Sequence, residues 1–317
     1  MGSIVAWSVF GVVVLVMLAL DLGVFHHREH EVKMKEAVIW SVVWTVIALV
    51  FNWGIYLVSG RELAMQFLAG YVLERTLSFD NLFVFLLVFN YFKLPGIHHH
   101  KVLFWGIFGA LVFRAVFIAC GIGLLHYFSW MIYVFGGILV WTGVKLAMEK
   151  DAKVDPEKNI FLKGFKRVMP VTSQFDHGRF FTRINGALFA TPLMVILIVI
   201  ESTDVIFAVD SIPAILAISR DPFIVYTSNV FAILGLRALY FVIAELMRLF
   251  HHLHYGLSLI LVLIGVKMLV ASFIHIPTSI ALGAILLILT LSVVASIIWP
   301  KKPEECKSGS EKPLPIP

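Results

Sequence analysis

Hydrophobic stretches of about 20 residues recur along most of this chain, and each is long enough to cross the hydrocarbon core of a membrane as a helix. Of the 317 residues, 60% are hydrophobic and only 14% are charged, whereas soluble domains average about 45–50% and 25%. A soluble fold is therefore excluded. The expected fold class is an all-α polytopic membrane protein, with the lipid bilayer as its first partner.

Nine apolar segments predict nine transmembrane helices. If the loops alternate between the two sides of the membrane, one side receives 18 basic residues and the other receives two, Arg61 and Arg220. Lys and Arg gather in cytoplasmic loops, so this asymmetry supports the count, with the N-terminus outside and the C-terminus in the cytoplasm. The segments lie near residues 4–25, 37–58, 65–91, 102–125, 127–148, 186–218, 223–247, 256–273 and 279–299.

The segments outside the predicted helices are short. Residues 149–185 form the only sizeable loop, which has room for a short interfacial helix but not for a folded domain. The polar tail, residues 300–317, is expected to be disordered. The net charge of +5 reflects basic residues in cytoplasmic segments, so nucleic acid is not an expected partner. The two cysteines, Cys120 and Cys306, form no disulfide framework and no metal or redox motif.

Two parts of the chain repeat each other at an offset of 122 to 124 residues. Each unit contains three predicted helices, so the second unit enters the membrane from the opposite side. We expect two inverted three-helix repeats, residues 65–148 and 186–273, with two helices before them in residues 1–64 and a ninth helix in residues 274–299. Matching pairs include Ser78 and Ser202, Asp80 and Asp204, Phe83 and Phe207, Arg114 and Arg237, and Lys145 and Lys267.

Inverted repeats are the architecture of many secondary transporters, whose substrate sites lie near the membrane midplane, often where a helix is broken. Pro213 predicts such a break in the long 186–218 segment, because proline removes a backbone hydrogen bond. The alternative is that the repeat is evolutionary scaffolding without a role in function. Acids at repeat-related positions favour the transporter interpretation.

Ionisable side chains lie in the middle of predicted helices, where each costs at least about 2.5–3.5 kcal/mol to insert. The alternative to a ligand site is that the acids only neutralise the arginines. Six intramembrane acids face five bases even when two lysines near helix ends are included, which favours a ligand site. On an ideal helix Asp210 lies about 120° from Asp204, so whether these two acids share one site is left open.

Carboxylate, amide and hydroxyl oxygens are hard donors that suit Mn²⁺, Ca²⁺ or Mg²⁺ better than Cu⁺ or Zn²⁺. We therefore expect a divalent cation as the substrate, with anion transport as a secondary possibility, and no cofactor. The candidate metal ligands are Glu74, Asp80, Asn81, Glu201, Asp204 and Asp210, and the candidate supporting residues are Ser78, Ser202, Thr203, Ser211, Arg114 and Arg237.

The chain resembles the TerC family of integral membrane proteins, and especially its bacterial Alx-type branch. The resemblance covers essentially the whole chain and rests on runs such as GYVLERTLSFDNLFVF, IESTDVIFAVDSIPAI, DPFIVYTSNVFAILGLRALYF and LVLIGVKMLV. It implies a nine-helix transporter of the bacterial inner membrane, distantly related to LysE-type exporters and associated with manganese export and tellurium resistance. It also implies a metal site at the six candidate ligands named above.

Several functions stay open. The leading hypothesis is a Mn²⁺ exporter that binds its ion between the third and sixth predicted helices and alternates access, with Ca²⁺ as an alternative substrate. A membrane scaffold for envelope or metal-stress complexes is the second hypothesis. An enzyme is not expected, because no predicted helix carries a catalytic arrangement such as HExxH or GxSxG. No ATP-binding motif is present, and H⁺ is the candidate coupling ion, taken up by Glu74 or Glu201 as the metal leaves. Cytoplasmic histidine clusters, including His98 to His100, could gather metal or be ordinary interfacial residues.

Overall fold

The structure of the protein is a computed structural model. It describes residues 4–26, 34–128, 130–148, 160–172, 175–176, 178–184, 186–246, 253–271, 273–274 and 276–298, without some side chains inside helices, among them Asp80 and Glu245. The predicted tail, residues 300–317, lies outside the described residues.

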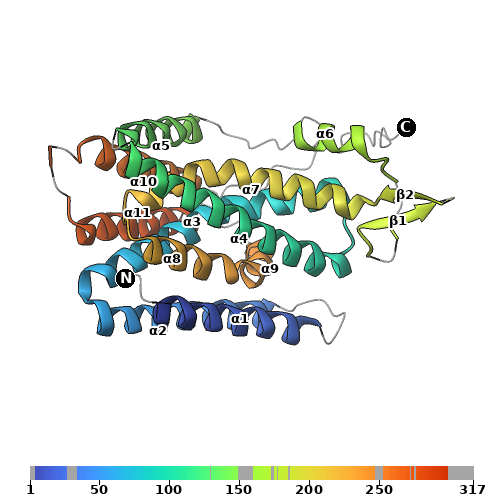
Figure 1. The fold of residues 1–317 in the computed structure, drawn as a ribbon, viewed down its shortest axis with the longest axis horizontal. Coiled ribbons are helices and arrows are strands. Elements are labelled where there is room, and N and C mark those ends of the chain that lie inside the picture. Colours follow the sequence, from blue (N-terminus) through green and yellow to red (C-terminus); the bar gives the residue numbers. More distant parts are fainter. Residues whose placement is uncertain are drawn as a thin grey trace.

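The described chain is built almost entirely of helices, with one short hairpin (Figure 1). The elements are α1 (Ile4–His26), α2 (Met34–Ser59), α3 (Arg61–Tyr91), α4 (Gly96–Tyr127), α5 (Met131–Met148), α6 (Ile160–Val168), β1 (Phe181–Ile184), β2 (Ala187–Ala190), α7 (Pro192–Leu216), α8 (Pro222–Leu234), α9 (Leu236–Leu246), α10 (Leu253–Leu269) and α11 (Thr278–Ile298).

Where the structure describes the chain, each apolar segment of the sequence is mainly helical, and only the start of the 186–218 segment is a strand. Within the described residues, five helices are long and apolar enough to cross a membrane, namely α2, α4, α5, α7 and α11, and a sixth is obtained if α8 and α9 form one bent span. This confirms an all-α membrane protein, while the number nine stays a prediction. Helix α3 is 31 residues long, but it is not among these five helices. Glu74, Arg75 and Asp80 give it more charge than the composition of a typical membrane-spanning helix.

Local sequence sets where α7 and α8 begin. Thr191 precedes α7 and Asp221 precedes α8, and each is followed by a proline at the first helical position, where its missing N–H costs nothing. The Asp221 side chain accepts hydrogen bonds from the N–H groups of Phe223 (2.9 Å) and Ile224 (3.3 Å). These bonds satisfy two of the donors that an open helix start leaves unpaired.

The 186–218 segment differs from the prediction in two ways. Its first residues form β2, which pairs antiparallel with β1, so the segment exceeds one span because it contains a strand. The predicted break before Pro213 is wrong, since α7 continues through Pro213 to Leu216. Proline removes the hydrogen bond from its own nitrogen to the carbonyl of Val209 one turn earlier, yet α7 is helical on both sides of it.

The helix break lies instead at Gly235, between α8 and α9, which are bent by 45° relative to each other. The side chain of Arg75 from α3 fills the space where a Cβ at Gly235 would stand. Its Nη1 donates a hydrogen bond to the carbonyl oxygen of Ala232 at 3.1 Å. Arg75 thus pairs a carbonyl in the last turn of α8, as a break at membrane depth requires.

Helices α5 and α10 pack through contacts that occur twice. A Cβ at Gly143 would meet the backbone of Ser258 and Val262, and a Cβ at Gly265 would meet the backbone of Gly136 and Val140. These six residues form three pairs at the repeat offset of 122, so one contact becomes the other when the two helices are exchanged. Such reciprocity is the signature of a two-fold axis.

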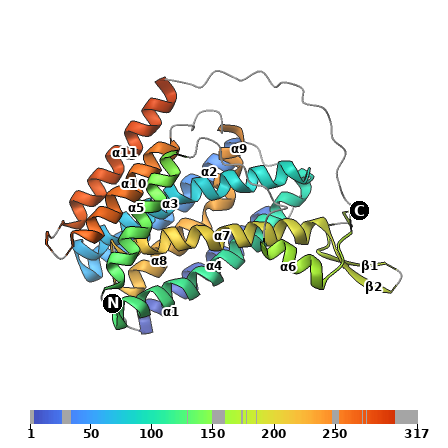
Figure 2. The same ribbon diagram turned by 90° about the horizontal axis from the view of Figure 1, so that it is seen from above.

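Helix α3 packs against α8 and α4 packs against α7, two contacts that would exchange under the predicted repeat. Helices α1 and α2 form an outer layer below α3, α8 and α9 in the view of Figure 1. Helix α6 and the β1–β2 hairpin gather at one end of the molecule, far from the turn between α10 and α11 (Figure 2). The charged side chains of interest lie between these ends, among α3, α4 and α7.

Candidate cation site

Arg114 on α4 is the centre of a buried charged cluster, with only 1% of its surface exposed. Its Nη1 forms an ion pair with Oε1 of Glu74 on α3. Its Nη2 and Nε donate to Oδ1 and Oδ2 of Asp204 on α7, at 3.2 and 3.4 Å. One guanidinium therefore joins two carboxylates from two other helices.

Two asparagines hold the same carboxylates from the other side. Asn81 Nδ2 donates to Asp204 Oδ1 at 3.0 Å, and Asn229 Nδ2 donates to Glu74 Oε2 at 2.9 Å. The amide oxygens of both asparagines are buried and have no hydrogen-bond partner among the described residues. Buried polar atoms are rarely left unpaired, so these two oxygens are available to a further donor or to a cation.

A third acid lies beside the cluster. Glu201 on α7 packs against Gly109 of α4 so closely that a Cβ at that glycine would collide with the carboxylate. Its Oε2 is buried and lacks a hydrogen-bond partner within the described part of the chain. Burial of several carboxylates around one guanidinium is costly unless additional positive charge is supplied.

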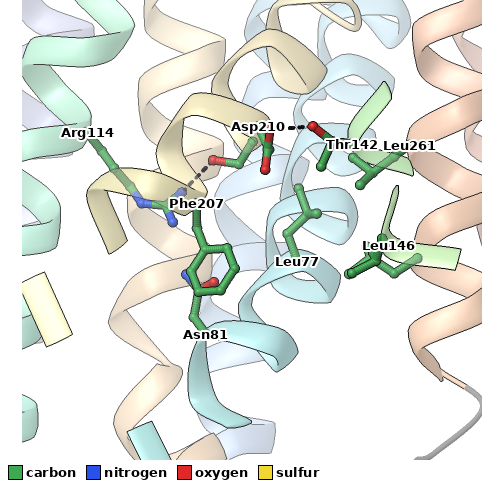
Figure 3. A pocket seen from close by; sticks show the side chains of 10 residues that line it. Leu77, Asn81, Arg114, Thr142, Leu146, Phe207, Asp210 and Leu261 are labelled. Carbon is green, nitrogen blue, oxygen red and sulfur yellow. Dashed lines mark hydrogen bonds between the residues drawn. The ribbon is translucent and has the colours of Figure 1, made fainter. Parts of the chain in front are cut away.

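A cavity of about 50 Å³ adjoins the cluster (Figure 3). Arg114 reaches it from one side, where its Nη1 donates to Ser211 Oγ at 3.1 Å. Asp210 lies on the other side and accepts a hydrogen bond from Thr142 Oγ1 at 2.8 Å. The lining residues are Leu77, Asn81, Arg114, Thr142, Leu146, Phe207, Asp210, Ser211, Leu257 and Leu261.

The structure brings some of the predicted residues together and separates others. Glu74, Asn81 and Asp204 share the cluster with Arg114 and Ser211, and Asp210 lies across the cavity. The side chain of Asp80 lies outside the described residues. The hydroxyls of Ser78, Ser202 and Thr203 donate to backbone carbonyls of their own helices, and Arg237, 3% exposed on α9, is not among the residues that line the cavity.

Two residues of the site escaped the sequence argument. Asn229 belongs to a run of three polar residues inside apolar α8, Thr227 to Asn229, all fully buried, and that run was the available signal. Thr142 on α5 is the one threonine in an apolar helix, and its bond to Asp210 spans 68 positions of sequence. Such a contact becomes visible only in three dimensions.

Among the described residues, no three His, Cys, Asp or Glu side chains are arranged to hold a metal ion. The guanidinium of Arg114 occupies the space between Glu74 and Asp204. Of the histidine clusters, His98 to His100 are described at the start of α4, where the ring of His99 stacks on Phe89 at 4.7 Å. A metal site at the six predicted ligands therefore stays a prediction.

Apolar helices of membrane-spanning length, with ionisable side chains buried among three of them, define an integral membrane protein with a polar centre inside its helical bundle. The chain belongs to the family described as "Integral membrane protein TerC family", whose sequence model matches residues 59–304. The match includes every helix that contributes to the charged cluster and confirms the resemblance found in the sequence.

Bacterial relatives cover nearly the whole chain. An "Uncharacterized membrane protein STKORF319" of Myxococcus xanthus is 46% identical over 94% of this chain and 93% of its own. The "Putative membrane-bound redox modulator Alx" of Escherichia coli (strain K12) is 44% identical over 92% of this chain and 94% of its own. An "Uncharacterized membrane protein" of Rickettsia felis is 39% identical over 92% and 97%. No solved structure matches the chain.

Proposed function

We propose that this protein exports a divalent cation, with Mn²⁺ as its substrate, from a site between α3 and α7. The observation that carries the proposal is the excess of buried acid. Glu74 and Asp204 share the single guanidinium of Arg114, and Glu201 beside them has an unpaired carboxylate oxygen. Intramembrane charges that their neighbours do not neutralise mark ion pathways.

The donor atoms around the cavity support a hard cation. Asn81, Thr142, Asp210 and Ser211 contribute oxygens, and none of the described residues that line the space carries sulfur or imidazole. Mn²⁺ accepts such oxygen sets in octahedral geometry, whereas Ca²⁺ takes six to eight oxygens at longer distances. A space of about 50 Å³ has room for a small ion with a few water molecules. Mn²⁺ is preferred over Ca²⁺ here because of the family resemblance.

The reciprocal contacts of α5 and α10 support two inverted repeats that rock against each other around the site. We place the N-terminus outside and the C-terminus in the cytoplasm, because 18 basic residues fall on one side and two on the other. The chain has no ATP-binding motif, so a gradient drives the export. We assign this coupling to H⁺, with Glu201 or Glu74 as the group that takes up the proton.

Metal accumulation in cells tests this proposal. In a bacterial strain without its own Mn²⁺ exporters, the wild-type protein should lower intracellular Mn²⁺, and Glu74→Gln should leave it high. Glu62→Gln is the matched control, because Glu62 lies on the same helix but in its exposed first turn. Lowered Ca²⁺ with unchanged Mn²⁺ would reassign the substrate. Unchanged levels of both ions would reject transport and favour the scaffold hypothesis.

A further inference from the structure

We propose that Arg114 is a tethered cation that competes with the transported ion. In the cation-free protein its guanidinium neutralises Glu74 and Asp204. When a divalent cation binds these carboxylates, the guanidinium moves across the adjoining cavity to Asp210. This inference rests on the proposed function and assigns to Arg114 the control of cation binding and release at the same site.

The contacts of Arg114 support competition. Three of the four carboxylate oxygens of Glu74 and Asp204 are bonded to its guanidinium nitrogens. A cation placed between the two carboxylates would occupy the volume that the guanidinium fills. Asn81 and Asn229 hold the same carboxylates independently of Arg114. The two acids can therefore keep their positions when the guanidinium leaves.

The cavity provides both a path and a second partner. Arg114 already donates to Ser211, the residue next to Asp210 in the chain, and both Arg114 and Asp210 line the cavity (Figure 3). One oxygen of Asp210 accepts from Thr142, and the exposed Lys145 of α5 interacts with this carboxylate electrostatically. Asp210 thus lies one residue beyond a group that the guanidinium already contacts.

Competition explains how a site with several acids can release its ion. A transport site must bind its ion strongly enough to load and weakly enough to unload. A returning guanidinium would supply positive charge to Glu74 and Asp204 as the metal departs, so the carboxylates would not be left unpaired in a low-dielectric environment. Arg114 would therefore lower cation affinity while it maintains turnover.

Cation binding to the purified full-length protein tests the inference. Arg114→Met removes the competing charge but keeps a long side chain, so its Mn²⁺ dissociation constant should be at least about tenfold lower than that of the wild type. Without metal the variant should melt at a lower temperature than the wild type, and Mn²⁺ should restore the difference because it binds the folded state. Its Mn²⁺ transport in liposomes should be slower.

A double-mutant cycle tests whether Asp210 acts by receiving the Arg114 guanidinium or by binding the cation directly. If Asp210 receives the displaced guanidinium, Asp210→Asn should weaken Mn²⁺ binding in the wild-type background and have little effect in Arg114→Met. If Arg114→Met does not fold, Arg114→Lys replaces it, because lysine keeps one charge but is shorter and lacks the forked donors that bond both carboxylates. The effect of Asp210→Asn should then be lost in Arg114→Lys.

Weaker Mn²⁺ binding by Arg114→Met, or a lowered melting temperature that Mn²⁺ does not restore, would overturn the inference and make Arg114 a permanent structural counter-ion. Equal effects of Asp210→Asn in both backgrounds would also overturn it. These results differ from failure of the proposed function. In that case neither the wild type nor any variant binds Mn²⁺, and cells with the Glu74→Gln variant contain as much Mn²⁺ as cells with the wild type.

Discussion

Helix α4 runs unbroken from Gly96 to Tyr127, whereas the segment predicted to be its repeat counterpart is divided at Gly235 into α8 and α9. The repeat-related arginines differ as well. Arg114 binds two acids in the middle of the protein, while Arg237 is buried on α9 away from the cavity. Within the described residues, the packing of α5 against α10 occurs twice, while the cavity adjoins the Arg114 cluster and is not lined by Arg237. The comparison therefore separates packing that repeats, at α5 and α10, from the contacts made by Arg114.

The largest effect should come from the charged cluster. Asp204→Asn removes one of the two carboxylates that the cation is proposed to bind and leaves Arg114 paired with Glu74 alone, so transport should fall by more than about 100-fold, equivalent to about 3 kcal/mol. Initial rates of Mn²⁺ efflux from loaded cells measure it. Asp80→Asn, at the repeat-related position, is predicted from the sequence to be equally severe. Half-rates in each variant would instead indicate two independent sites.

Proton coupling should depend on Glu201, the acid beside the Arg114 cluster. If Glu201 takes up the proton as the metal leaves, export should accelerate when the outside is more acidic than the inside, and Glu201→Gln should remove most of this dependence. Gly109→Ala should have a similar but weaker effect, because the new methyl group displaces the Glu201 carboxylate. Gly123→Ala on the same helix meets no neighbour and is the control.

The symmetric packing of α5 and α10 gives a prediction of equal effects. A Cβ at Gly143 or Gly265 would meet backbone atoms at 2.8 Å, which cannot yield as a flexible side chain can. Gly143→Ala and Gly265→Ala should each lower the free energy of unfolding by about 1–3 kcal/mol, seen as similar drops in melting temperature in detergent. Gly137→Ala on α5 faces open space and should be neutral. Clearly unequal drops would argue against a two-fold axis.

The smallest effect should appear at the helix break. Arg75→Met leaves the carbonyl of Ala232 without its side-chain donor, which should cost about 1 kcal/mol of stability. Arg75→Lys keeps a donor and should lose less. Thermal melting of both variants measures the difference. A larger loss in the lysine variant would show that the planar guanidinium, rather than the hydrogen bond, supports the bend.

The helices could be predicted from the sequence because apolar stretches of spanning length have few alternatives in a membrane. The members of the charged cluster could be predicted in part. Glu74, Asn81, Asp204 and Arg114 stood out as polar residues in apolar helices, and the repeat drew attention to Arg114 and Asp204. The bond that joins Arg114 to Asp204 spans 90 positions, and residue spacing along a helix says nothing about such partners.

The helix break shows where local rules fail. Pro213 is the stronger breaker by propensity, but α7 stays helical through it to Leu216. Gly235 is the weaker breaker, yet the break lies there because Arg75 from another helix fills the space beside it and bonds Ala232. Tertiary contact therefore decides between two candidate positions that the sequence ranks in the opposite order.

The central claim is that the buried carboxylates bind a divalent cation and pass it across the membrane. Purified protein in liposomes that enclose a Mn²⁺-sensitive dye tests it most directly, with Asp204→Asn and the exposed-site control Glu62→Gln measured alongside. The account predicts Mn²⁺ flux through the wild type and Glu62→Gln, and none above protein-free liposomes through Asp204→Asn. Equal flux through all three proteins, or none through the wild type, would contradict it.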